Sequence, residues 1–457
     1  MKLRFFSAFT LCAVALSAIG VSPAAGSASP SASNAQIRAV VAAVSAADLR
    51  AYDTKLVGFG TRNDFSETLN SPTRGIFAAR DYIRAQFDAD AARSNGHMTV
   101  ALDTFVHPKT EQTPRDVTES SIIATLTGDR PGPTYVMSSH YDDCNGDCTD
   151  GKNDAPGADD NGSGSSAVLA AAKAMAGFTH FRGKIVFAVF DGEELGLWGA
   201  EHFSESLKTA GDDVVANLNN DIVGTPDTGG PDRFVVRVFS EALPPDVKVG
   251  AVNTYGTENS SPSRELARFI ADVVPQYVTQ FHVRSVWRAD RFGRGGDQEE
   301  FQKRLFPAVR FVEAHENFYH QHKNVRVENG VQYGDLLKYI DFAYMQRVTQ
   351  ANVASLAALA LGPGEPQSVA MPYHGLGYQQ LGNDTTLTWT KAPGAASYEI
   401  VWRATDSPVW QHAKNVGDVT TATVPVSHDD YIIGVRSIGA DGLRSVVVDP
   451  VPQRLRP

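Results

Sequence analysis

The feature that most constrains the fold is a series of short apolar segments, each followed by acidic or histidine side chains. The segments cover residues 135–139, 184–190, 214–219 and 308–312, and helix-like apolar spacing lies between them. Apolar spacing also predicts a helix at 37–47 and a long helical stretch at 335–361. The segment 184–190 is apolar at nearly every position, which is typical of a strand buried on both faces. Strands that alternate with helices predict an α/β fold, with a mostly parallel sheet covered by helices on both faces.

Polar side chains follow each of these strands. They are His140 and Asp142, the run 191–194 (DGEE), Asp221, and, after a short loop, the run 319–322 (YHQH). A glycine-rich run, 157–164 (GADDNGSG), also precedes a predicted helix at 163–175. Because the carboxyl ends of parallel strands share one edge of a sheet, we expect these side chains to face one another. Crowded carboxylates destabilise a fold unless a cation holds them, so the pattern predicts bound metal ions.

The residue types at this edge indicate zinc. Imidazole and carboxylate groups are both zinc ligands, and one carboxylate can bridge two ions about 3.5 to 4 Å apart. Zinc lowers the pKa of a bound water to about 7, which makes a nucleophile available near neutral pH. The adjacent Glu193 and Glu194 point in different directions along an extended segment. One of them can therefore bind metal while the other acts as a general base.

The ordered motifs resemble those of the secreted bacterial leucyl aminopeptidases, members of a di-zinc peptidase family that also includes glutaminyl cyclases. The motifs are His140-x-Asp142, 157–164, 191–196 (DGEELG), 219–224 (NNDIVG) and 319–320 (YH), and the resemblance covers about residues 120–324. It implies that His140 and Asp221 hold one zinc ion, that Glu194 and His320 hold the other, and that Asp160 bridges them.

The same resemblance implies roles for the surrounding residues. Glu193 is expected to be the general base, Asp142 to orient His140, and Tyr319 to stabilise an oxyanion. The Asp160–Asn161 peptide bond is expected to be cis.

Two positions near the last motif complicate this assignment, and a third, Asp297, matches the family. Asn324 replaces an acid common in the family, and His322 competes with His320 as the last ligand. Asp297 matches a family acid with a supporting role.

These observations predict a zinc-dependent aminopeptidase that removes N-terminal residues from peptides. Three alternatives stay open: glutaminyl cyclase, carboxypeptidase or dipeptidase activity at the same site, and a metal-free binding protein on the same fold. The Gly-rich run is not a phosphate-binding loop, because it lacks the Lys-Ser/Thr ending and carries two acids.

Composition shifts along the chain predict its domains. Residues 1–28 have the basic start, apolar body and small-residue end of a secretory signal peptide, which predicts a secreted or periplasmic protein. The catalytic domain is expected at 35–361 and a Pro- and Gly-rich linker at 362–367. Residues 368–452 show short alternating strands that resemble a fibronectin type III β-sandwich.

Charge limits the classes of binding partner, and cysteine content indicates the cellular compartment. The net charge is −11 and no basic run is long enough to follow a phosphate backbone, so nucleic acid is not an expected partner. No segment after the signal reaches the roughly 18 apolar residues of a membrane span. Cys144 and Cys148 are expected to form a disulfide in an oxidising compartment. The sequence predicts no oligomeric state.

Overall fold

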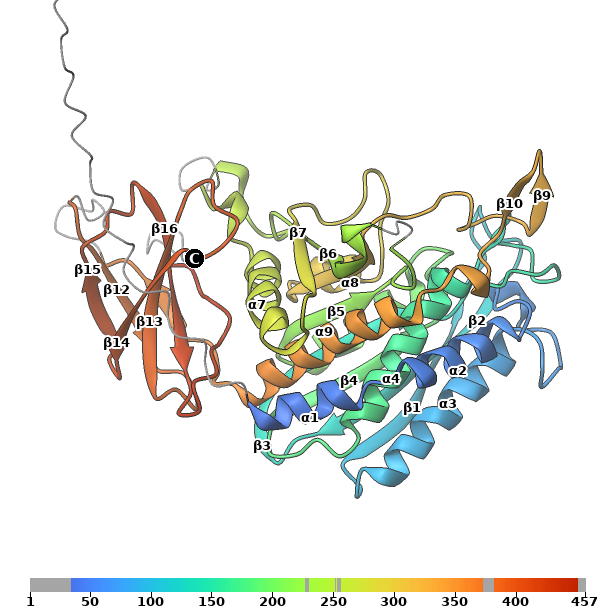
Figure 1. Ribbon diagram of the computed structural model, residues 1–457, viewed down its shortest axis with the longest axis horizontal. Coiled ribbons are helices and arrows are strands. Elements are labelled where there is room, and N and C mark those ends of the chain that lie inside the picture. The colour runs from blue at the N-terminus through green and yellow to red at the C-terminus, as the bar shows by residue number, and fades with distance from the viewer. Residues whose placement is uncertain (1–33, 227–229, 251, 253–255, 373–381, 451–457) are drawn as a thin grey trace, which may run out of the picture.

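The computed structural model describes residues 34–226, 230–250, 252, 256–372 and 382–450. The predicted signal peptide, 1–28, lies outside the described residues. Figure 1 shows a large part built from a sheet and helices, and a smaller part built from strands at the carboxyl end.

The helices of the large part are α1 (Ala35–Ala43), α2 (Ala46–Val57), α3 (Ile76–Arg93), α4 (Gly164–Met175), α5 (Trp198–Ala210), α7 (Pro262–Tyr277), α8 (Gln298–Lys303) and α9 (Phe342–Leu361). Its short helical segments are η1 (Asp64–Ser66), η2 (Ala158–Ser163), η3 (Pro231–Phe234), η4 (Thr257–Asn259) and η5 (Leu337–Tyr339). Within the described residues, no helix is both long and apolar enough to cross a membrane.

The strands of the large part are β1 (Met98–His107), β2 (Val117–Thr127), β3 (Arg130–His140), β4 (Arg182–Phe190), β5 (Val214–Asn220), β6 (Val235–Ser240), β7 (His282–Val286), β8 (Ala308–Glu313), β9 (Arg326–Glu328) and β10 (Val331–Tyr333). Eight of them form one sheet in the order β1-β2-β4-β3-β5-β8-β6-β7. The four central strands, β4, β3, β5 and β8, run parallel, and β1 and β2 extend the sheet in antiparallel fashion. The predicted fold class is confirmed.

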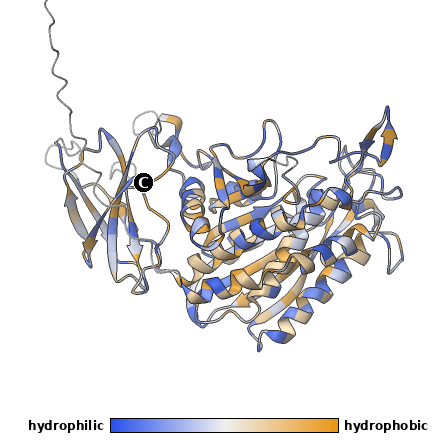
Figure 2. Cartoon of the chain, in the orientation of Figure 1, coloured by the Kyte–Doolittle hydropathy of each residue, from blue (hydrophilic) through white to orange (hydrophobic). Residues whose placement is uncertain are grey.

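Both faces of the central sheet are buried, as the apolar strand at 184–190 predicts. Along β4, Ile185, Phe187 and Val189 point into a core that includes side chains of α4 and α9. The alternate residues Val186 and Phe190 point into a second core, with side chains of α5 and α8. Figure 2 shows hydrophobic colouring on the central strands and α9. Period-two alternation between two apolar cores explains why this strand carries so few polar residues.

Some predicted helix bounds are wrong. The helix expected at 37–47 ends at Ala43, and α2 begins after Ser45, whose hydroxyl accepts the backbone N–H groups of Ala47 and Asp48. A serine that caps a helix start favours a new helix there over continuation of the first one. The helical stretch expected at 335–361 is interrupted in the same way before Asp341, which caps α9.

The carboxyl-terminal part contains two small antiparallel sheets. One joins β11 (Gln367–Ala370), β12 (Thr385–Thr390) and β15 (Thr421–Val424), and the other joins β14 (His412–Gly417), β13 (Ser397–Ala404) and β16 (Tyr431–Ile438). Side chains from both sheets share one buried cluster that includes Trp389, Ile400 and Val435. This part is all-β, as expected, and its kinship to fibronectin type III modules stays a prediction.

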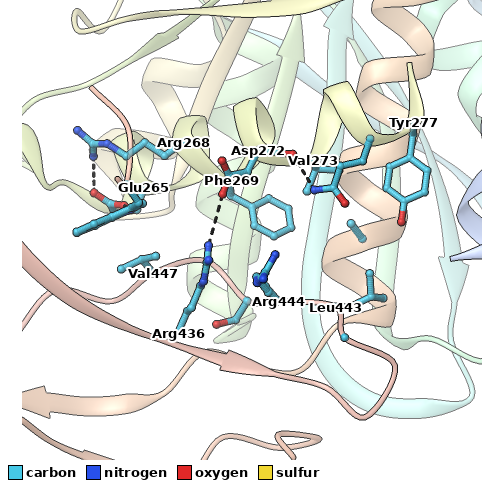
Figure 3. Close-up of a pocket in the computed structure, with 15 residues that line it drawn as sticks. Glu265, Arg268, Phe269, Asp272, Val273, Tyr277, Arg436, Leu443, Arg444 and Val447 are labelled. Atoms are coloured by element: carbon cyan, nitrogen blue, oxygen red, sulfur yellow. Dashed lines mark hydrogen bonds and ion pairs between the residues drawn. The ribbon is translucent and has the colours of Figure 1, made fainter. Parts of the chain in front are cut away.

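The two parts pack against each other along α7. The indole N–H of Trp410 donates to Glu265 at 2.9 Å, and Arg403 donates to the backbone oxygen of Asn259 at 2.9 Å. Figure 3 shows Arg436 of β16 reaching Asp272 of α7, at the edge of a small pocket between the two parts. The interface combines apolar contacts, such as those of Leu443 and Val446 with the main core, with buried charged groups from both sides.

Candidate metal centre

The central strands end at the same level of the sheet, which brings the predicted ligands together. His140 is the last residue of β3 and pairs in register with Phe190, the last residue of β4. Asp221 directly follows Asn220, the last residue of β5. Because these neighbouring strands end at the same level, their polar side chains meet at one edge of the sheet.

The first group of ligands is His140, Asp160 and Asp221. The Nε2 atom of His140 lies 3.5 Å from Asp160 Oδ1 and 3.6 Å from Asp221 Oδ1. Two ligands that each lie 2.1 Å from a tetrahedral zinc ion are about 3.4 Å apart, so this spacing fits one shared ion. All three residues are buried, and His140 Nε2 and Asp221 Oδ1 have no hydrogen-bond partner among the described residues. Buried nitrogen and oxygen atoms that lack a hydrogen-bond partner are suited to bind a metal ion.

A second group shares Asp160 with the first. The Nε2 atom of His322 lies 3.0 Å from Asp160 Oδ2 and 3.1 Å from Glu194 Oε1. The Glu194 carboxylate raises the pKa of His322 to about 11. A metal ion replaces the proton on such an imidazole, since ligands bind metals in their deprotonated forms. The two oxygens of Asp160 therefore face two different groups, which is the arrangement of a bridging carboxylate.

His320 is not in either group, so its prediction as the last ligand is corrected to His322. The ring of His320 stacks on Tyr339, with centroids 3.8 Å apart and planes 13° apart. His322 has a positive φ of 50° in a turn of the chain, and its ring reaches both Asp160 and Glu194. Sequence motif alone favours the first histidine, whereas this turn presents the second one to the site.

Tyr319 is exposed and packs against a neighbouring tyrosine. It is 56% exposed, and its ring meets Tyr333 edge-on with centroids 5.6 Å apart. Within the described residues it makes no hydrogen bond to a predicted ligand. The structure therefore gives its predicted oxyanion role no geometric support.

Glu193 lies beside the first group without belonging to it. Its Oε2 atom is 4.0 Å from His140 Nε2, farther than Asp160 or Asp221. Burial raises the pKa of Glu193 well above its ordinary value, and the neighbouring carboxylates of Asp221 and Glu194 raise it further, against the opposing effect of His140. A carboxyl group that lies beside the ligands without being one of them is placed to act as a general base.

Asp142 links the two motifs after β3 and β4. Its Oδ1 atom lies 3.2 Å from Nδ1 of His140, and its Oδ2 atom accepts the backbone N–H of Glu194 at 2.9 Å. Contact with Nδ1 leaves Nε2 of His140 facing Asp160 and Asp221. Asp142 thus holds the ring and the following Glu194 backbone in one arrangement.

The loop that carries Asp160 is tied to β5. The Asp160–Asn161 peptide bond is cis, as expected. Asn161 donates to the backbone oxygen of Asn220 at 2.9 Å and accepts from the backbone N–H of Gly164 at 2.9 Å. A Cβ atom on Gly164 would lie 2.2 Å from the oxygen of Asn220, so only glycine permits this close approach.

Two residues that sequence reasoning missed support the ligands. Arg310 of β8 is fully buried and lies 2.7 Å from Asp221 Oδ2 and 2.8 Å from Asp290 Oδ2. Burial alone would raise the pKa of Asp221, but Arg310 and His140 outweigh it and hold that pKa below its usual value. An arginine inside the otherwise apolar strand 308–312 is the sequence signal that could have indicated a buried acidic partner.

The other missed residue is Asp335, which follows β10. Its carboxylate accepts the backbone N–H groups of Asp159 and Asp160 at 2.7 to 3.0 Å and so fixes the backbone of the bridging residue. The supporting acid Asp297 is fully buried near the site, and burial raises its pKa to about 8. No local pattern distinguishes Asp335 from other loop acids.

A disulfide joins Cys144 and Cys148, as expected, and its loop lies against the second group. One atom each of Cys144, Cys148, Glu194 and His322 lie within 4.8 Å of one another. Because the cysteines are bonded to each other, they are not free to bind a metal. Asn324 accepts the backbone N–H of Gly146 at 2.9 Å and thereby ties this loop to the chain after His322.

Comparison with known proteins agrees with this geometry. A model of a family described as peptidase family M28 matches residues 121–330. A probable zinc metalloprotease of Leptosphaeria maculans is 41% identical over 426 residues, which cover 91% of this chain and 97% of the relative. The predicted resemblance named bacterial enzymes, whereas this sequence relative is fungal.

Solved structures show the same fold at low identity. The LapA aminopeptidase of Legionella pneumophila superimposes with a TM-score of 0.51 at 19% identity, over 70% of this chain and 74% of that chain. A glutaminyl cyclase of Macrostomum lignano superimposes with a TM-score of 0.50 at 14% identity, over 73% and 94% of the two chains. Given the identity and coverage of its sequence relative, the chain belongs to peptidase family M28.

Proposed function

We propose that this protein is a zinc-dependent aminopeptidase that hydrolyses the N-terminal residue from peptides. The observation that carries the proposal is Asp160, whose two oxygens face His140 on one side and His322 on the other. One zinc ion would be held by His140, Asp160 and Asp221, and a second by Asp160, Glu194 and His322. The orphaned buried atoms and the mixed imidazole and carboxylate donors support zinc at both positions.

The residues divide the chemistry among them. Bound zinc supplies Lewis-acid polarisation of the scissile carbonyl and lowers the pKa of a water molecule. Glu193 takes a proton from that water and delivers it to the leaving amine, for which its raised pKa is suited. Asp142 keeps the His140 ring oriented throughout.

The charge of the site supports a preference for free N-termini. The six acids Asp142, Asp160, Glu193, Glu194, Asp221 and Asp297 exceed by one charge the two zinc ions and Arg310 together, and this surplus favours a protonated amine over a substrate carboxylate. The fold shared with the LapA aminopeptidase agrees with this preference.

The experiment is Glu193→Gln, measured together with metal content. We expect the variant to keep the wild-type zinc content of two ions per chain and to lose about 10²- to 10⁴-fold in kcat on an aminoacyl nitroanilide. Loss of zinc would show that Glu193 is a ligand, and unchanged turnover would reject it as the base. Hydrolysis that continues after zinc removal by a chelator would reject the metal mechanism as a whole.

The same protein should be assayed on three matched peptides. Cleavage of an unblocked peptide but not of its N-acetylated form supports an aminopeptidase, whereas loss of the C-terminal residue from both forms supports a carboxypeptidase. A peptide with N-terminal glutamine tests cyclisation, which the fold shared with a glutaminyl cyclase makes the second candidate. Formation of pyroglutamate without hydrolysis would replace the proposal.

We also propose that the protein is exported, to the outside of the cell or to the periplasm. The predicted signal at residues 1–28 and the Cys144–Cys148 disulfide support export. The N-terminal sequence of protein recovered from the culture medium or the periplasm tests it, with cleavage expected between residues 24 and 28.

A further inference from the structure

A third group of buried acids lies beside the metal centre and takes no part in the proposed reaction. It consists of Asp64 in η1, Glu119 in β2 and Asp191 directly after β4, and we call it the acid trio. One oxygen from each residue lies within 4.8 Å of the other two. Their exposed fractions are 1%, 0% and 1%, so the acid trio is closed off from solvent.

Most of the oxygens in the acid trio have no partner outside the trio. Asp191 Oδ2 accepts the backbone N–H of Ser120 at 2.6 Å and lies 3.2 Å from the Tyr141 hydroxyl. The other five carboxylate oxygens, both of Asp64, both of Glu119 and Oδ1 of Asp191, have no hydrogen-bond donor from any other described residue. Asp64 lies within hydrogen-bonding reach of Glu119 and of Asp191, and two carboxyl groups can make such a contact only when a proton lies between them. No lysine, arginine or histidine among the described residues forms an ion pair with any of the three.

Such a group cannot stay ionised without compensation. Taking a carboxylate out of water is costly, and each additional one nearby adds repulsion. Burial, with the Asp191 carboxylate next in effect, raises the pKa of Glu119 to about 10. The acid trio therefore needs either a bound cation or protons that its members share.

We propose that the acid trio is a site for a structural calcium ion. All its donors are oxygens, which favour hard cations, whereas zinc sites normally include nitrogen or sulfur. One oxygen of each acid already lies within 4.8 Å of the other two, and the second carboxylate oxygens and the Tyr141 hydroxyl beside Asp191 are available to complete the six ligands that calcium requires at least. Calcium also accepts bidentate carboxylates in irregular geometry, while magnesium prefers to keep several waters, for which a closed site is poorly suited.

The position of the acid trio gives the ion a structural role. Asp191 directly precedes Gly192, Glu193 and Glu194, the turn that carries the proposed base and a proposed zinc ligand. A Cβ atom on Gly192 would lie 2.8 Å from Glu119 Oε2, so the acid trio packs directly against this turn. A calcium ion there would fasten η1, β2 and the turn after β4 together.

The test compares calcium content and thermal stability in the full chain. Purified protein is equilibrated with CaCl₂, freed of unbound metal and analysed for calcium and zinc in the same sample. We expect one calcium per wild-type chain and a Tm on the order of 5 °C higher in CaCl₂ than in EGTA. Glu119→Gln should lose both the bound calcium and the Tm difference while its zinc content stays at the wild-type level.

Asp53→Asn is the matched control. Asp53 in α2 is equally buried and has two unpartnered oxygens, but it is not part of the acid trio. This variant should keep the calcium and the Tm difference. If Glu119→Gln does not fold, Asp64→Asn and the wild-type calcium content decide the question.

Two results would overturn the proposal. Wild-type protein that holds no calcium and unfolds at the same Tm in CaCl₂ and EGTA would show that the acids share protons. An additional equivalent of zinc in place of calcium would reject the hard-cation assignment. The proposal does not depend on the proposed function, because zinc content and turnover are measured separately from calcium content.

Discussion

The metal centre and the acid trio lie only three residues apart in the chain, at Glu194 and Asp191, but they compensate their charges in different ways. Imidazoles and the Arg310 guanidinium face the acids of the metal centre. The acid trio contains oxygen donors alone. Donor chemistry, rather than the number of carboxylates, therefore determines which ion each group suits.

The largest expected effect separates the two histidines of the metal centre. His322→Ala removes a donor that faces Asp160 and Glu194, so we expect zinc content to fall from two ions to one and kcat to fall more than about 100-fold. His320→Ala should keep both zinc ions and most activity, because His320 stacks on Tyr339 instead. Metal analysis and nitroanilide kinetics check both variants, and the opposite pattern would restore His320 as the ligand.

The second prediction removes Arg310, the buried guanidinium group beside the metal centre. Arg310→Met leaves Asp221 and Asp290 buried without their guanidinium partner, which should lower the free energy of unfolding by about 3 to 5 kcal/mol. Urea unfolding measures the change. Arg326→Met is the control, since its partner Glu328 is exposed and the pair contributes at most about 1 kcal/mol. An equal loss in the two variants would show that Arg310 does not compensate the site.

The third prediction uses pH to distinguish a bound calcium ion at the acid trio from protons that the three acids share. In EGTA, Glu119 has a pKa of about 10 in the folded state and about 4.3 when unfolded, so the folded state binds the extra proton. The contribution of this group to stability is therefore fully present below about pH 4.3 and is lost as pH rises toward 10, by at most about 1.4 kcal/mol per unit. Unfolding curves at pH 6, 7 and 8 should show this slope in EGTA, and CaCl₂ or Glu119→Gln should flatten it.

The smallest expected effect concerns the hydroxyl group beside the acid trio. Tyr141→Phe removes a group that lies within hydrogen-bonding distance of Ser120 O and Asp191 Oδ2, which should cost about 1 kcal/mol and weaken calcium binding. Tyr344→Phe removes a buried hydroxyl that donates to Val235 and should cost a similar amount without changing the calcium response. Calcium titrations that are identical for the two variants would exclude Tyr141 as a ligand.

Local pattern was sufficient for the sheet and for most of the metal centre. The apolar strand at 184–190, buried on both faces, predicted the parallel sheet, and the acids after each strand predicted which side chains meet at its edge. His140, Glu194 and Asp221 could be predicted because strand ends of a parallel sheet are brought to one level whatever the loops do, whereas Asp160 lies in a loop and was implied by the family resemblance.

Where the last ligand and the supporting groups lie was decided only by the tertiary structure. His320 and His322 differ by two positions in a loop, and the turn at His322 selected between them. Arg310, Asp335 and the acid trio come from segments far apart in the chain, which no periodic pattern relates to one another. The physical reason is that hydrophobic periodicity fixes elements and their order, whereas contacts between distant polar side chains depend on how the finished elements pack.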